Sequence, residues 1–317
     1  MQASIPQQMK AVAIDRYGGP EVLQVTTLPV PSPGADEVLI RLDAAGIGVW
    51  DPEVRSGAFE IGERRFPKII GNDGAGQVAA VGSRVKRVGP EDRVYAYSME
   101  GGFYAEYVAV KQGNVAPVPQ GLDNEQAGAL GADGITALRG LDDALHIRRG
   151  EKLLVFGASG GIGHLAVQLA KRLGAEVFAV ASGEDGVALM RRLGVDQAVD
   201  GKHGAVVDRL RSFAPEGLDA ALVLTGGKGL ETALAQVKKG GRVAYPNGVE
   251  PEPEAPKGVT LRAYDGESGP EALDRLNELV SQGPFHVEVR FYRPEDAAQA
   301  HRDVEKHHLG KFALRMR

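Results

Sequence analysis

The segment EKLLVFGASGGIGHLAVQLAKRLGA, Glu151 to Ala175, places an apolar strand, a glycine turn and an amphipathic helix in immediate succession. The first glycine allows a tight exit from the strand, the next two leave no side chain between backbone N–H groups and a phosphate, and the last lets the helix lie close to the sheet. A second apolar strand, EVFAVA, follows. This order predicts a unit that binds a dinucleotide through its pyrophosphate, and the expected contacts are Gly157, Ala158, Gly160, Gly161, Ile162 and Gly163.

The end of the second strand indicates which dinucleotide is bound. A carboxylate there would accept a hydrogen bond from the ribose 2′-hydroxyl and would repel a 2′-phosphate. The strand ends at Ser182 without an acid, although Glu184 and Asp185 follow and could still reach the ribose. Ser182 offers a hydroxyl, and Lys202 or Arg191 could supply a cation. The sequence therefore favours NADP(H) over NAD(H), with Ser182 and Lys202 as expected contacts.

The chain of 317 residues is about two domains long, and its pattern changes at about residue 124. Short alternating or β-branched strands, such as EVLIRLDAAGI, come first, and helix-length segments alternating with short apolar strands follow. The final segment, 309–317, is a predicted strand that returns to the first domain. We expect an α/β protein with a β-rich domain over 1–123 and 285–317 and a doubly wound parallel-sheet domain over 124–284.

Composition excludes several classes of protein. The net charge of −5 and the pI near 5.9 argue against nucleic acid as the main partner. The chain has no cysteine, which rules out disulfides, a thiol nucleophile and thiolate metal sites. The N-terminal sequence MQASIPQQ has no basic region followed by an apolar core, and no window approaches 18 apolar residues. We therefore expect a cytoplasmic protein that acts on a small molecule and has no membrane partner.

Seven segments in chain order carry a family resemblance: MKAVAIDRYGGPEVLQV, PSPGADEVLIRLDAAGI, GNDGAGQVAAVGSRV, EDRVYAYSMEGGFYAEYVAV, GITALRGL, VFGASGGIG and LGKFALRM. They resemble motifs of the medium-chain dehydrogenase/reductase superfamily, and within it the zinc-independent quinone oxidoreductase branch. The resemblance implies a GroES-like catalytic domain made from both chain ends, an inserted Rossmann domain, and a cleft between them for the nicotinamide. It also implies a homodimer formed through Rossmann sheet edges, and GVTLRAYDG, Gly258 to Gly266, reads as such an edge strand.

The metal ligands of related zinc alcohol dehydrogenases are missing. Those enzymes carry a histidine and a cysteine where this chain has Asn72 and Gly48. We therefore expect no metal site, and we expect Asp73 in the same glycine turn to be a hydrogen-bond acceptor that stabilises the turn. The seven histidines are scattered singly except for the adjacent His307 and His308, so we expect them to be solvated surface residues.

Without a metal Lewis acid, hydride delivery to a quinone or an α,β-unsaturated carbonyl is favoured over oxidation of a simple alcohol. Backbone N–H groups or the hydroxyls of Tyr95, Tyr97 or Thr136 could stabilise the charge that develops. The two tyrosines could equally be strand residues with one face buried. Trp50, the only tryptophan, could shape the substrate pocket beside Gly48 or pack in the core.

The resemblance adds expected contacts with the cofactor. Thr136 would flank the nicotinamide together with residues at two later strand ends, and Lys311 could help to select NADPH; the strand-end residues are Thr225, Tyr245 and Asn247. Two other functions stay open. One is an enoyl or alkenal reductase, and the other is a non-catalytic NADPH-binding sensor with the same fold.

Overall fold

The computed structural model describes residues 5–203 and 205–317, which form two compact units. The first unit takes in the described residues up to Ala132 together with Ser268–Ser281 and Val289–Arg317, and the second takes in Asp133–Glu267 and Gln282–Glu288. The predicted domain boundaries, 1–123 with 285–317 and 124–284, stay a prediction. The compact units differ from them mainly at helix α8 (Pro270–Val280), where Asn277 accepts a hydrogen bond from the Tyr95 hydroxyl at 2.9 Å.

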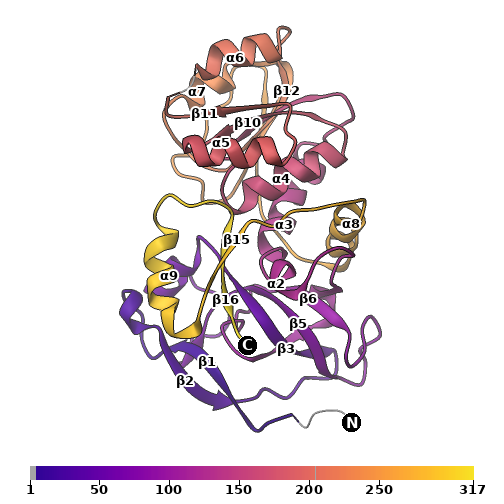
Figure 1. Cartoon of the computed structure of the whole chain (residues 1–317), viewed down its shortest axis with the longest axis vertical. Coiled ribbons are helices and arrows are strands. Elements are labelled where there is room, and N and C mark those ends of the chain that lie inside the picture. Colours follow the sequence, from indigo (N-terminus) through magenta and orange to yellow (C-terminus); the bar gives the residue numbers. More distant parts are fainter. Residues whose placement is uncertain (1–4, 204) are drawn as a thin grey trace. The chain divides into compact units, whose positions relative to one another are not determined.

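The first unit is rich in β-strands, as expected (Figure 1). A small antiparallel sheet has the order β2–β1–β4, where β1 is Gln8–Ile14, β2 is Gln24–Pro29 and β4 is Lys68–Ile69. The larger sheet is built from β3 (Glu37–Ile47), β5 (Asp73–Val81), β6 (Arg93–Tyr97), β7 (Tyr107–Lys111), β8 (Val115–Pro117), β15 (Val289–Tyr292) and β16 (Lys311–Arg315). Its strand order within the described residues is β15–β16–β3–β5–β6–β8, and β7 pairs with β3.

The two ends of the chain share this larger sheet. Strand β16 lies beside β3 (Figure 1). The two strands pair antiparallel, and Phe312 lies opposite Ile47. The predicted return of segment 309–317 to the first unit is therefore confirmed. The helices of this unit are α1 (Asp51–Ser56), α2 (Asn124–Ala127), α8 and α9 (Ala297–Val304), with short 3-10 turns at Pro20–Val22, Gln112–Asn114 and Pro294–Asp296.

The second unit contains a parallel sheet. Its strands are β9 (Lys152–Phe156), β10 (Glu176–Ala181), β11 (Gln197–Asp200), β12 (Leu218–Val223), β13 (Val237–Pro246) and β14 (Thr260–Tyr264). Their order among the described residues is β11–β10–β9–β12–β13–β14, and every pair is parallel. In chain order this is 3-2-1-4-5-6, the arrangement of a dinucleotide-binding Rossmann sheet. Strand β14 lies at the edge, as predicted for 258–266.

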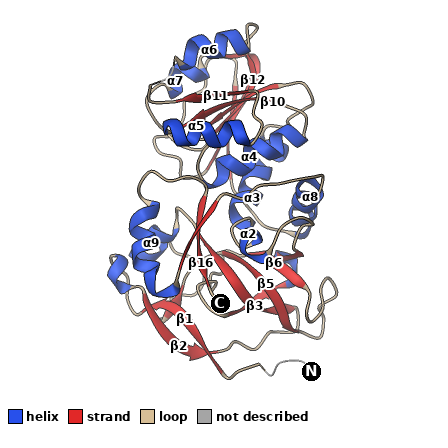
Figure 2. Cartoon of the chain, viewed as in Figure 1, coloured by secondary structure: helices blue, strands red, loops and turns tan. Residues whose placement is uncertain are grey.

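Helices cover this sheet and bury its apolar residues (Figure 2). They are α4 (Gly161–Arg172), α5 (Gly183–Arg192), α6 (Val206–Phe213) and α7 (Leu230–Leu234), and α3 (Gly131–Leu138) continues into a π-helix at Arg139–Ala144 before β9. Leu154, Phe156 and Val223 pack with Leu210 of α6 and Leu234 of α7. No helix in the described part of the chain is long and apolar enough to cross a membrane.

Candidate functional site

The predicted glycine turn joins β9 to α4 in the second unit. Gly157 has a φ of +90°, which glycine adopts without strain, and its N–H donates to the carbonyl oxygen of Val180 at 3.1 Å. Gly160 is the residue before α4 and provides no side-chain cap. The first N–H groups of α4 therefore have no capping side chain, and a helix end of this kind binds anions.

The space around the turn fits a pyrophosphate. A Cβ added to Gly163 would collide with the carbonyl oxygen of Gly157, so only glycine lets α4 lie this close to the turn. A Cβ added to Gly160 would come no closer than 3.8 Å to other atoms, so this glycine borders open space at the helix end. Gly161 and Ile162 are partly exposed beside it, whereas Ala158 is buried. The residues present could hold the phosphates of a dinucleotide.

Other predicted cofactor contacts lie at the same edge of the parallel sheet. The carboxyl ends of neighbouring parallel strands meet there. A Cβ on Gly157 would lie 2.9 Å from the Cγ2 of Thr225, which follows β12. The N–H of Ser182, after β10, donates to the hydroxyl of Ser159 in the glycine turn at 3.2 Å. Asn247 follows β13 and is exposed. Their contacts with a cofactor stay predictions.

An acid lies at the end of β11, the strand next to β10, where an acid that binds the ribose would be expected. Asp200 ends β11 directly beside Ala181 of β10. It accepts hydrogen bonds from the N–H groups of Lys202 at 3.0 Å and Gly183 at 3.2 Å, and His203 Nδ1 lies 3.0 Å from its other oxygen. The bond from the Lys202 N–H, with that from His203, holds the pKa of Asp200 below its usual value. The side chain of Lys202 is exposed. This loop therefore carries both the negative Asp200 carboxylate and the positive Lys202 ammonium group.

Tyr245 and Thr136, two predicted site residues of the second unit, are packed against other residues of that unit. Tyr245 belongs to the core cluster, and burial, followed by the nearby Glu252, raises the pKa of its hydroxyl. Thr136 lies in α3 against Gly266, where an added Cβ would meet the threonine hydroxyl. Their positions beside the nicotinamide stay predictions.

The predicted residues of the first unit also have partners. Tyr95 is fully buried, and its hydroxyl donates to the side-chain oxygen of Asn277. This agrees with the alternative that Tyr95 is a strand residue on a buried face. The Trp50 ring lies 6.1 Å from that of Phe59 at a tilted angle. Lys311 is buried, and its ammonium group forms an ion pair with Asp73 at 2.6 Å. The catalytic roles of Tyr95 and Trp50 and the cofactor contact of Lys311 stay predictions.

The glycine turn at Gly71–Gly76 holds this buried ion pair. Asp73 Oδ2 accepts from Lys311 and from the N–H of Ala132 at 2.9 Å. Gly46 of β3 has no room for a side chain because an added Cβ would meet the Asp73 carboxylate. The Asn72 amide donates to the carbonyl oxygen of Ser98 at 3.1 Å. As expected, Asp73 acts as a hydrogen-bond acceptor.

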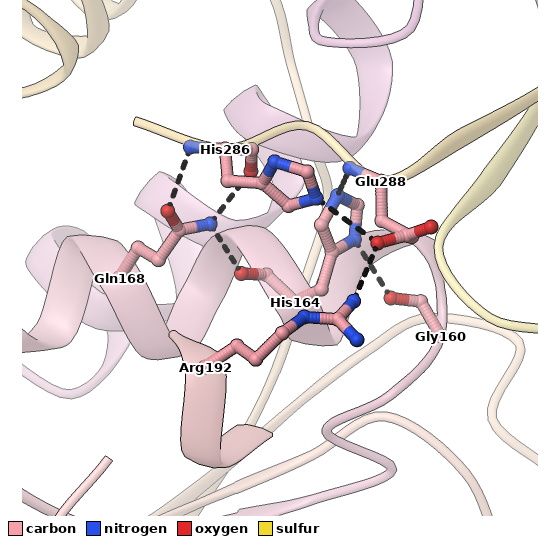
Figure 3. Close-up of polar contacts among 6 residues, drawn as sticks. All are labelled: Gly160, His164, Gln168, Arg192, His286 and Glu288. Carbon is pink, nitrogen blue, oxygen red and sulfur yellow. Dashed lines mark hydrogen bonds and ion pairs between the residues drawn. The ribbon is translucent and has the colours of Figure 1, made fainter. Parts of the chain in front are cut away.

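The expectation of solvated histidines was wrong for two of them, because His164 and His301 are fully buried. His164 Nε2 accepts from the N–H of Glu288 at 3.1 Å, so Nδ1 carries the hydrogen and donates to the carbonyl oxygen of Gly160 at 3.0 Å (Figure 3). Burial lowers the pKa of His164 to about 4, so the ring is neutral near pH 7. The sequence carries one sign that His164 is buried, because this residue lies on the apolar face of the helix, one turn after Gly160.

The segment 286–288 is fixed to α4 by further contacts. The Gln168 amide donates to the carbonyl oxygens of His164 and His286, each at 2.8 Å, and accepts from the N–H of His286 at 2.9 Å (Figure 3). Glu288 also pairs with Arg192 at 3.1 Å and with the His286 ring at 2.9 Å. Through His164, these contacts reach the carbonyl of the glycine that borders the open space.

Comparisons with known proteins agree with this architecture. A family model described as alcohol dehydrogenase GroES-like domain matches residues 34–120, and one described as zinc-binding dehydrogenase matches residues 161–261. The quinone oxidoreductase of Mus musculus is 30% identical over 311 residues, covering 93% of this chain and 94% of the relative. The NADPH-dependent alkenal/one oxidoreductase of Arabidopsis thaliana is 33% identical, covering 89% and 72%. The solved structure of an NAD-dependent alcohol dehydrogenase has a TM-score of 0.87 at 30% identity, covering 97% and 99%.

The Rossmann sheet with its glycine turn and the GroES-like match together define an oxidoreductase of the dehydrogenase/reductase class. The chain belongs to the medium-chain dehydrogenase/reductase superfamily and, within it, to the quinone oxidoreductases.

Proposed function

We propose that this protein is an NADPH-dependent oxidoreductase that reduces a quinone or an α,β-unsaturated carbonyl without zinc. The observation that carries the proposal is the glycine turn, with its close helix packing at Gly163 and its open space at Gly160. The quinone oxidoreductases and the alkenal/one oxidoreductase among the relatives support the two acceptor classes. NADPH, when bound, supplies a hydride from C4 of its nicotinamide.

The residues that would hold the cofactor lie at one edge of the second unit's sheet. The glycine turn and the first turn of α4 would bind the pyrophosphate. Ser182 and the Lys202 ammonium group would bind the 2′-phosphate, with Asp200 opposing it by like-charge repulsion. Thr225 and Asn247 would lie nearer to the nicotinamide. The absence of an acid at the end of β10 supports NADPH over NADH.

The proposal of zinc independence rests on the side chains at the positions that hold zinc ligands in related enzymes. Gly48 has no side chain, the Asn72 amide is bonded to a backbone carbonyl, and the chain has no cysteine. Nitrogen and sulfur ligands of the kind that zinc prefers are therefore missing at the superfamily positions. An acceptor activated by its own conjugation needs no Lewis acid.

Two expectations belong to this proposal, and one rival function shares its site. A homodimer is supported by the exposed edge strand β14, in which Leu261 is 38% exposed. A cytoplasmic location stays a prediction from the sequence. A sensor that binds NADPH without turnover shares the dinucleotide site, so the two functions are separated by measuring turnover with a panel of quinones, enones and primary alcohols.

Cofactor choice tests the assignment of individual residues. Lys202→Ala should weaken NADPH about 10-fold and leave NADH unchanged, because one charge-assisted hydrogen bond contributes about 1.5–3 kcal/mol before solvent screening. Asp200→Asn should shift the preference further toward NADPH. Dissociation constants from nicotinamide fluorescence would show both effects, with Lys257→Ala on an exposed loop as the control. Equal constants for the two cofactors in the wild type would refute the NADPH assignment.

A further inference from the structure

Two polar side chains meet where β13 and β14 end, at the edge of the second unit's sheet that carries the glycine turn. Pro246 of β13 lies opposite Tyr264 of β14. The next residues along the two strands are Asn247 and Asp265. The Asn247 amide nitrogen donates to Asp265 Oδ1 at 2.7 Å, and the Asn247 backbone N–H donates to the carbonyl oxygen of Tyr264 at 2.9 Å. Both polar side chains are exposed, so a ligand at this edge of the sheet can reach them.

The direction of the side-chain hydrogen bond follows from the groups available. A carboxylate only accepts, so the Asn247 atom that faces Asp265 is the NH2 group. This group has a second hydrogen, and Asp265 has a second oxygen, Oδ2. Among the hydrogen bonds of the described residues, none uses that hydrogen or ends on Oδ2. The pair therefore offers a ligand one N–H donor and one carboxylate acceptor.

The backbone that carries Asp265 is anchored on both sides of this residue. The Tyr264 hydroxyl is buried against the π-helix, where a Cβ added to Gly140 would collide with it. On the other side, a Cβ added to Gly266 would meet the Thr136 hydroxyl of α3. The exposed carboxylate thus stands on a fixed strand end and is held by Asn247 before any ligand binds. A polar group fixed in this way suits a binding site.

The strand order indicates which half of a dinucleotide lies beside the pair. In a sheet of order 3-2-1-4-5-6, each half of the sheet binds one mononucleotide, and the dinucleotide crosses the point where the order reverses. Ser182 and Asp200 follow or end strands of the first half, whereas β13 and β14 belong to the second half and lie two and three strands from β9. At about 4.8 Å per strand, the pair is about 10–14 Å from β9 across the sheet. The pair is therefore on the nicotinamide side of the glycine turn.

We propose that Asp265 binds the carboxamide group of the nicotinamide and that Asn247 positions the Asp265 carboxylate. This inference rests on the proposed function and deepens its cofactor site, in which Asn247 was expected and Asp265 was not. A primary carboxamide has two N–H hydrogens and one accepting oxygen. Asp265 Oδ2 accepts from the carboxamide nitrogen, and the second hydrogen of the Asn247 NH2 group donates to the carboxamide oxygen. A ring held through its carboxamide keeps one orientation, which fixes the direction in which C4 faces.

Only a carboxylate can serve both neighbours of this position. A side-chain amide has one accepting oxygen, which it can present to Asn247 or to the carboxamide but not to both. Asp265→Asn therefore keeps the size of the side chain and loses one of the two hydrogen bonds. Because Asp265 is exposed, the substitution should leave the fold intact.

Ligands that differ in the nicotinamide ring test this assignment through binding alone. Isothermal titration calorimetry would give dissociation constants for NADPH, for its 3-acetylpyridine analogue, which lacks the carboxamide N–H groups, and for 2′-phospho-ADP-ribose, which has no nicotinamide. The wild type should bind NADPH about 10-fold more tightly than the analogue, because the analogue cannot donate to the carboxylate. Asp265→Asn should bind NADPH and the analogue about equally, and Asn247→Ala should reduce the preference as well. All three proteins should bind 2′-phospho-ADP-ribose with the same affinity.

A control variant separates the hydrogen bond from a general effect of charge. Glu267→Ala removes an exposed carboxylate two residues after Asp265 and should keep the wild-type preference for NADPH over the analogue. A wild type without this preference, or an Asp265→Asn protein that retains it, would overturn the proposal. An equal loss of affinity for all three ligands in Asp265→Asn would also contradict it, because the change would then not be confined to the carboxamide. A wild type that shows the preference but reduces no acceptor would refute the proposed function and support the assignment of Asp265.

Discussion

His164 is the residue through which the segment 286–288 reaches the glycine turn, and its removal should weaken both the fold and the cofactor site. His164→Ala deletes a ring that donates to the carbonyl oxygen of Gly160 and accepts from the N–H of Glu288 (Figure 3). Both bonds are made by a side chain with no exposed surface. The Gly160 carbonyl oxygen would keep the hydrogen bond from the backbone N–H of residue 164 at 3.1 Å but would lose its second donor, so the peptide that precedes the first N–H groups of α4 would be held less firmly.

The size of the effect follows from the Glu288 N–H, which is left unpaired, and from the lost hydrogen bond to Gly160. A buried donor without a partner costs about 1–3 kcal/mol and a lost hydrogen bond about 0.5–1.5 kcal/mol, so the free energy of unfolding should fall by about 1.5–4.5 kcal/mol. If about 1.4 kcal/mol of this loss also weakens phosphate binding at the glycine turn, NADPH should bind about 10-fold more weakly. The same loss should apply to NADH, because the pyrophosphate is common to both cofactors.

Two control variants separate positioning from general destabilisation. Gln168→Ala removes the bonds to the backbone of His286 but leaves Gly160 untouched, so it should lower stability with little change in NADPH affinity. His286→Ala removes a half-exposed ring and should change neither quantity measurably. Urea unfolding and nicotinamide fluorescence give the two quantities for each protein. An unchanged NADPH dissociation constant in His164→Ala, or an equal loss in Gln168→Ala, would refute the reasoning.

The acid stability of the protein tests the same residue by another route. The pKa of His164 is lowered from 6.5 to about 4 in the folded state, so between these values the unfolded chain takes up a proton that the folded chain does not. The contribution of His164 to stability is therefore fully present above pH 6.5 and falls as the pH drops toward 4, by about 3 kcal/mol at about 1.36 kcal/mol per pH unit. His164→Gln should show a shallower loss of stability over this range. A loss as steep as that of the wild type would contradict a buried, neutral His164.

Other variants test the remaining buried contacts. Lys311→Met should lower the free energy of unfolding by about 3–5 kcal/mol because it leaves the buried Asp73 carboxylate without its cation, whereas Lys171→Met, at a half-exposed pair, should change it far less; equal effects would contradict the account. Gly160→Ala should weaken NADPH at least about 10-fold without lowering the thermal midpoint, because its Cβ enters open space, whereas Gly163→Ala should lower both. A Gly160→Ala protein with wild-type affinity would show that the phosphates lie elsewhere.

The strands with strong local patterns could be predicted from the sequence. The predicted segments EVLIRLDAAGI and EVFAVA coincide with β3 and β10, because their buried residues are β-branched or apolar throughout. Strand β2 (Gln24–Pro29) was not predicted, and none of its residues is buried. Its pairing with β1 provides the hydrogen bonds, and backbone pairing leaves no mark on the sequence.

The residues of the candidate site also differ in whether the sequence alone could predict them. The glycine turn was predicted because its residues are contiguous and each glycine has a local reason to be there. The burial of His301 was missed because its ring contacts Arg55 and Tyr104, which lie 246 and 197 positions away in the chain. A lone histidine in an amphipathic helix gives no sign of a partner that far away. Asp200 was missed because it ends β11, whereas the sequence pattern places the acid that binds the ribose at the end of β10.

Transfer of a hydride from NADPH to a conjugated acceptor can be followed with an isotope. The wild-type protein would be incubated with NADPH that carries deuterium at both C4 positions of the nicotinamide and with an enone, and the product would be analysed by mass spectrometry and NMR. The account predicts a saturated ketone with one deuterium on the carbon β to the carbonyl. No product despite tight NADPH binding, or a product that carries no deuterium, would contradict it.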